Sequence, residues 1–162
     1  MPSPSKYLAT YLNDHLLGST VGTELARRAA RENRGSELGE FLTGLAGEIE
    51  GDRETLLALM AELGVKPDRL KVAAGWTGEK LGRLKPNAQL RGYSPLSPLV
   101  ELEGLLIGIQ GKLAMWQVLA EVAVALGIDR ARLEELSARA ERQQADVERH
   151  RLDVGRGALT AV

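Results

Sequence analysis

Side chains that could bind a metal or transfer a proton are sparse in this sequence, and its two histidines come first among them. His15 lies in the middle of an apolar helical stripe, and His150 lies at the edge of another. A helical bundle that holds two iron or manganese ions uses a Glu-x-x-His pair on each of two helices, with single glutamates from the other two. Neither histidine has Glu or Asp three residues before it. The sequence therefore lacks the ligand spacing of a di-metal centre.

A second group of candidates lies where the apolar stripe of residues 36–63 is interrupted. The residues expected to point inward there are Asp52 and Arg53, about one helical turn after Glu48. His15 and Asp52 are nearly equally distant along the chain from the turn between the first two helices. Because a helix rises ~1.5 Å per residue, both side chains are expected at one level of a bundle. We predict that His15 and Asp52 contact each other or share a neighbour.

This level is best interpreted as a structural polar layer, because amides with an ion pair suit a hydrogen-bonded network better than a metal, which needs several carboxylates. The residues assigned to the layer are His15, Asp52, Arg53, Gln110 or Gln117, and Gln143 or Gln144, with Gln110 and Gln144 preferred. Two alternatives stay open. One is a divergent single-metal site of His15, Glu48 and Asp52, and the other is that these side chains point elsewhere.

Composition excludes several other kinds of chemistry. The chain has no cysteine, and no serine has the sequence signature of an activated nucleophile. Its glycines lie inside helical patterns rather than after a strand, so no phosphate-binding loop is indicated. We expect no catalytic residues and no cofactor. A net charge of −1 and 4% aromatic residues argue against nucleic-acid binding. No run approaches the ~18 apolar residues of a membrane span, and the N-terminal residues lack a signal-peptide core, so we expect a soluble cytoplasmic protein without membrane contact.

Apolar periodicity predicts an all-α fold in a single domain over residues 1–162. The expected elements are helices over 4–33, 36–63, 96–126 and 129–154, a long crossover with a short helix within 66–95, and a frayed tail over 155–162. The two short connections make each helix pair antiparallel. Glycines at spacings of three and four, such as Gly18 and Gly22 or Gly104 and Gly108, are interpreted as close helix–helix seams.

The helix expected over 96–126 is the most apolar segment, and its apolar residues do not keep to one face. Leu102, Leu106 and Ile109 belong to an inward stripe, whereas Ile107 and Val118 lie outside it. A helix that is apolar nearly all round is buried on several sides. We therefore predict a homodimer that associates through this helix and the short crossover helix. The alternative is a monomer in which the crossover helix and the loop through Tyr93 cover this surface completely.

The order of a short-loop helix pair, a long crossover and a second short-loop pair resembles the ferritin-like four-helix bundle. The resemblance is strongest from Glu48-Ile49-Glu50-Gly51-Asp52 to Leu63-Gly64, which is similar to the second helix of small bacterial stress-type ferritin-like proteins. Glu48 matches the family glutamate, and Asp52 stands where the family has a histidine. The resemblance implies iron or manganese in that family, but the di-iron motif is not intact here.

Taken together, these observations predict a non-catalytic binding or assembly protein with a ferritin-like fold. The alternative function is a divergent metal-binding oxidase or stress protein that uses His15, Glu48 and Asp52 with Fe or Mn.

Overall fold

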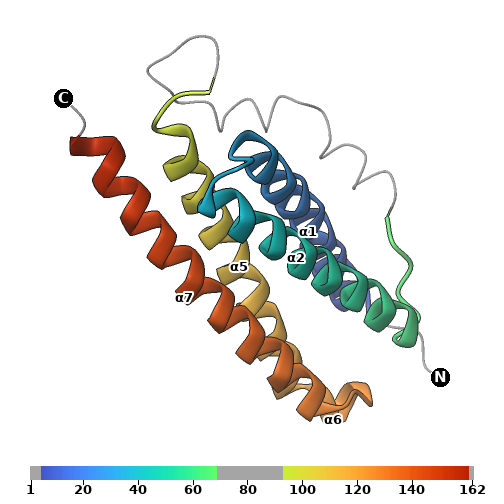
Figure 1. The fold of residues 1–162 in the computed structure, drawn as a ribbon. Helices are drawn as coiled ribbons and strands as arrows, with labels where there is room; N and C mark the ends of the chain where they lie inside the picture. The colour runs from blue at the N-terminus through green and yellow to red at the C-terminus, as the bar shows by residue number, and fades with distance from the viewer. Residues whose placement is uncertain (1–4, 69–92, 161–162) are drawn as a thin grey trace.

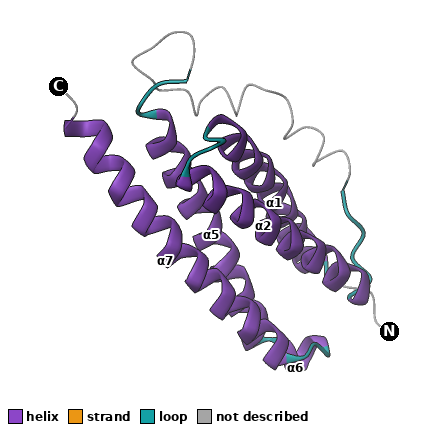
Figure 2. Ribbon diagram, in the orientation of Figure 1, coloured by secondary structure: helices purple, strands orange, loops and turns teal. Residues whose placement is uncertain are grey.

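A computed structural model describes residues 5–68 and 93–160 of the chain. All secondary structure in these two ranges is helical (Figure 2). The helices are α1 (Lys6–Glu32), α2 (Glu37–Glu62), α5 (Ser97–Glu121), α6 (Ala123–Leu126) and α7 (Arg130–Thr160). The all-α prediction is confirmed. The short helix expected within the crossover falls mostly on residues 69–92, outside the described residues.

Local sequence explains where the first two helices begin. Ser5 caps α1 by accepting a hydrogen bond from the backbone N–H of Leu8, and Ser36 caps α2 by accepting one from Gly39. A serine hydroxyl at this position satisfies one of the backbone N–H groups that the first helical turn leaves unpaired. Gly35, with φ of 84°, turns the chain between the two helices.

The second helix pair is joined by Gly127, whose φ of 68° ends α6 in the left-handed conformation. α7 then continues to Thr160. The prediction that this helix ends at residue 154 is therefore wrong, and so is the prediction of a frayed tail for residues 155–160. Gly155 packs beside the Leu99 side chain, and the Thr160 hydroxyl bonds the carbonyl of Arg156. Contact with α5 and this hydrogen bond support helix where fraying was expected because chain ends are often poorly ordered.

The four long helices form two antiparallel pairs, α1 with α2 and α5 with α7 (Figure 1). Figure 1 shows α2 and α5 running in one direction and α1 and α7 in the other. The pairs meet mainly through α1 and α5, while α2 and α7 share a smaller contact. The core comprises two apolar clusters, one around Trp116 and Leu59 and the other around Leu42 and Ile109.

The predicted glycine seams are not found at the glycines of α1, α2 and α5 whose surroundings the structure describes. A Cβ added there would meet nothing within 4 Å at Gly18, Gly22, Gly44, Gly47, Gly51, Gly108 and Gly111. The interpretation was wrong because helical spacing aligns glycines on a face without fixing what that face contacts. Within the described ranges, no helix combines the length and apolar character that a membrane span requires.

Candidate functional site

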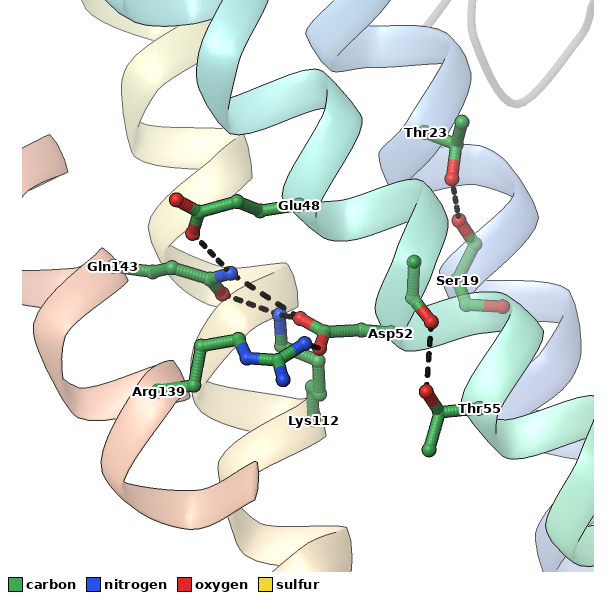
Figure 3. A network of polar contacts seen from close by, with 9 residues as sticks. Ser19, Thr23, Glu48, Asp52, Thr55, Lys112, Arg139 and Gln143 are labelled. Carbon is green, nitrogen blue, oxygen red and sulfur yellow. Dashed lines mark hydrogen bonds and ion pairs between the residues drawn. The ribbon is translucent and has the colours of Figure 1, made fainter. Parts of the chain in front are cut away.

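The most buried charge near the centre of the bundle is the carboxylate of Asp52, whose exposed fraction is 3%. Lys112 from α5 places its Nζ 2.5 Å from Oδ2, and Arg139 from α7 places Nη1 2.9 Å from Oδ1 (Figure 3). Each carboxylate oxygen therefore has a cationic donor. A buried carboxylate needs such partners, because a charged group that is removed from water without a partner is strongly destabilising.

Gln143 completes this arrangement from α7, and its side chain is buried. Its Nε2 donates to Asp52 Oδ2 at 3.2 Å and to Glu48 Oε2 at 2.9 Å, while its Oε1 accepts from Lys112 Nζ (Figure 3). We call these five residues the charge cluster: Glu48, Asp52, Lys112, Arg139 and Gln143. The cluster joins α2, α5 and α7, and its two carboxylates are matched by two cations.

Burial lowers the pKa of the Lys112 ammonium, and the Asp52 carboxylate opposes that shift by attracting the positive charge. The Lys112 side chain is largely buried, with an exposed fraction of 13%. In such surroundings the ammonium depends on its two acceptors, Asp52 and Gln143. Among the described residues, no group of three or more His, Cys, Asp and Glu side chains is placed to hold a metal ion.

His15 lies outside the charge cluster. It is half-buried on α1, with its ring edge-on to Tyr11 at a centroid distance of 4.6 Å. Burial lowers the pKa of the His15 imidazole, and the neighbouring Asp14 carboxylate partly offsets this. His15 and Asp52 line one cavity between α1, α2 and α5, but the hydrogen-bond partners of Asp52 are Lys112, Arg139 and Gln143.

Of the remaining members of the predicted polar layer, Arg53 lines the same cavity as His15 and Asp52, whereas Gln110 and Gln144 pair with each other outside it. Arg53 Nε donates to Thr20 Oγ1 at 3.2 Å, and Gln144 Nε2 donates to Gln110 Oε1 at 2.7 Å, where Gln110 is exposed. Of the two amides considered on α7, the one that enters the core is Gln143, and the preferred Gln144 does not. One step around a helix turns a side chain by about 100°. The buried residues Ala140 and Val147 share their face with position 143.

Sequence reasoning missed both cations of the cluster. Long basic side chains on charged helices usually extend into solvent, so nothing in the sequence singles out Arg139. Lys112 carried a usable signal, because it is the only basic residue between Ser97 and Glu121 in an otherwise very apolar helix.

A second buried carboxylate also escaped the sequence analysis. Glu101, near the start of α5, accepts from Arg28 of α1 at 3.0 and 2.8 Å and from the Tyr93 hydroxyl at 2.7 Å. Asn33 donates to the same hydroxyl at 2.7 Å. Burial and the Glu101 carboxylate raise the pKa of Tyr93 above its ordinary value. These contacts fasten the end of α1 to the beginning of α5.

Comparison with known proteins returns no match to a family model, a curated protein or a solved structure.

Proposed function

We propose that this protein is a ferritin-like bundle in which paired side chains occupy the position of a metal centre, and that it serves in binding or assembly rather than in catalysis. The helix directions support the fold, since α2 and α5 run the same way across the long crossover (Figure 1). That connection is characteristic of ferritin-like bundles.

The observation that carries the proposal is the position of Lys112 Nζ between Asp52 and Gln143. Asp52 stands on the second helix where the ferritin-like pattern places a metal-binding histidine, and its two oxygens are engaged by Lys112 and Arg139. A divalent ion would have to displace both Lys112 and Arg139 from Asp52. Leaving the Lys112 ammonium unpaired is unfavourable, because its side chain is only 13% exposed. The ammonium thus supplies the positive charge that a metal would bring.

Metal analysis of the purified protein tests this proposal. The expected iron and manganese content is far below one ion per chain, and it stays unchanged in Asp52→Asn. A near-stoichiometric content that falls in Asp52→Asn would instead favour an oxidase that uses His15, Glu48 and Asp52.

Assembly is proposed to occur as a homodimer through α5, with the crossover contributing. Three apolar side chains on one face of this helix and its end are exposed: Ile107 at 75%, Val118 at 52% and Val122 at 42%. Helical periodicity of 3.6 residues places all three within about 60° of one another. Exposed apolar patches of this kind commonly mark interfaces, and symmetric dimers are the most frequent assembly.

Light scattering at micromolar concentration tests the dimer. Twice the chain mass of 17.5 kDa is expected for the wild-type protein, and a single mass for Ile107→Lys/Val118→Lys. Gln117→Lys, an exposed change on another face of the same helix, serves as the charge control. A mass of one chain for the wild-type protein at every concentration would contradict this part of the proposal.

A further inference from the structure

A cavity of about 190 Å³ lies between α1, α2 and α5. It opens to solvent between α1 and α5, where Gly18 and Gly108 line it and are exposed. A Cβ added at either glycine would meet no neighbouring atom within 4 Å, so the space beside both is open. Most of the wall is apolar, with contributions from Ile49, Leu105 and Met115. An apolar group can therefore enter the cavity from solvent.

The side chain of Arg53 brings a positive charge to this cavity. Arg53 shares a face of α2 with Ile49 and Leu56, because helical residues three and four apart point the same way. All three line the cavity, and Ile49 and Leu56 are buried whereas Arg53 is half-buried. Its Nε donates to Thr20 Oγ1 of α1 at 3.2 Å. The side chain therefore crosses from α2 towards α1 along the cavity.

The two terminal nitrogens of Arg53 have no partner within residues 5–68 and 93–160. Only its Nε forms a hydrogen bond there, and no carboxylate of these ranges lies within ion-pair distance of the guanidinium. In the same ranges, the indole nitrogen of Trp116 is the one fully buried side-chain nitrogen or oxygen without a partner. Nη1 and Nη2 of Arg53 are therefore not fully buried, and they keep solvent-accessible surface.

The other charges around the cavity do not match this cation. Asp52 lines the cavity, but the charge cluster to which it belongs is balanced, with two carboxylates and two cations. Asp14 lies at the exposed rim and forms no ion pair with Arg53. His15 is neutral at neutral pH, because burial lowers its pKa. A carboxylate would complement the guanidinium, which can present two parallel N–H donors to the two carboxylate oxygens.

We propose that this cavity binds a small monocarboxylate with an apolar body, and that the carboxylate pairs with Nη1 and Nη2 of Arg53. Ligand size follows from the volume, since an engineered apolar cavity of about 150 Å³ takes up benzene. The present cavity, at about 190 Å³, has room for one ring. The inference rests on the proposed binding role and specifies the class of ligand. Metal analysis and light scattering test that role without this ligand, so the two can fail independently.

The test compares benzoate with benzamide. The two probes have the same shape and number of heavy atoms, but only benzoate is charged at neutral pH. NMR titration follows the ring signals of His15, which lines the cavity, and His15→Gln distinguishes them from those of His150. Benzoate is expected to bind saturably, to shift the His15 signals and to bind about tenfold more tightly than benzamide. This is the lower end of what a hydrogen bond to a charged group contributes, because Arg53 is only half-buried.

Substitutions of Arg53 test the role of its charge. Arg53→Gln should remove the preference for benzoate and leave the affinity for benzamide unchanged, which also shows that the variant keeps its fold. Arg53→Lys keeps the charge and should retain part of the preference. Equal affinity of the wild-type protein for the two probes, or a preference for benzoate that survives Arg53→Gln, would overturn the inference.

Substitutions of glycine test the location. Gly108→Leu fills the cavity and should abolish binding of both probes. Gly44→Leu makes the same substitution at another exposed helical glycine with open space and should leave binding unchanged. Binding that survives Gly108→Leu, saturable binding without a shift at His15, or no saturable binding of benzoate would each overturn the inference.

Discussion

Lys112 Nζ lies 2.5 Å from Asp52 Oδ2, which links α5 to α2 across the two helix pairs. Arg139 makes the corresponding link from α7 to the other oxygen of Asp52 at 2.9 Å. One carboxylate of the first pair is therefore held by both long helices of the second. Since α2 and α7 share only a small contact, polar links such as this one and the Arg132–Glu62 ion pair contribute much of what joins them.

Removing the Asp52 carboxylate should lower the free energy of unfolding. Asp52→Ala leaves Lys112 and Arg139 without their shared acceptor, and breaking a buried ion pair from one side typically costs about 3–5 kcal/mol. Urea unfolding should show a loss of stability in that range. The exposed Glu54, on the same helix, provides the control, because Glu54→Ala should change stability by less than ~0.5 kcal/mol. Equal effects of the two variants would show that the cluster does not hold the helix pairs together.

Protonation of His15 should lower the free energy of unfolding in mild acid. Its pKa is lowered in the folded state, so the unfolded chain takes up the proton first as pH falls below about 6.5. The free energy of unfolding should therefore decrease as the pH falls below that value, and this contribution should be complete above it. His15→Gln should show a smaller decrease between pH 7 and 5, measured by urea unfolding. NMR titration of the ring should give a pKa below that of the urea-unfolded chain, and a higher value would contradict the assignment.

Tyr93 should make the protein less stable at alkaline pH. Its pKa is raised in the folded state, so above about pH 10 the unfolded chain loses the phenolic proton while the folded protein keeps it. Stability should therefore fall as pH rises from that point. Tyr93→Phe removes the hydrogen bond to Glu101, which should cost about 1 kcal/mol at neutral pH. The same variant should flatten the alkaline decline, and an unchanged decline would argue against this contact.

Two glycines of α2 should respond oppositely to alanine. A Cβ at Gly44 meets nothing within 4 Å, whereas one at Gly39 would approach the carbonyl oxygen of Asn33 to 2.1 Å. Gly44→Ala should stabilise the protein by about 0.5–1 kcal/mol through helix propensity. Gly39→Ala should destabilise it, because backbone atoms cannot move aside as a flexible side chain can. Thermal unfolding of the two variants distinguishes these outcomes, and a shift of the same sign in both would contradict the described turn.

Sequence periodicity predicted the helical fold and the starts of α1 and α2 because apolar spacing and serine caps are local signals. It also placed Asp52 at an interior position, since a charged residue interrupting an apolar stripe is conspicuous. The partners of Asp52 were not predictable in the same way. Whether Gln143 or Gln144 enters the core depends on the rotation of α7, which is set by contacts with α5. The inward course of Lys112 and Arg139 likewise depends on a carboxylate from another helix.

The central claim is that Lys112 supplies the charge that a metal would otherwise bring to Asp52, and metal-dependent stability tests it most directly. The free energy of unfolding is measured with a chelator and with excess Fe²⁺ or Mn²⁺. We predict equal values, because both oxygens of Asp52 already have cationic partners. A metal at a hundred times its dissociation constant would stabilise the folded state by about 2.7 kcal/mol. Stabilisation of that size, lost in Asp52→Asn, would contradict the account.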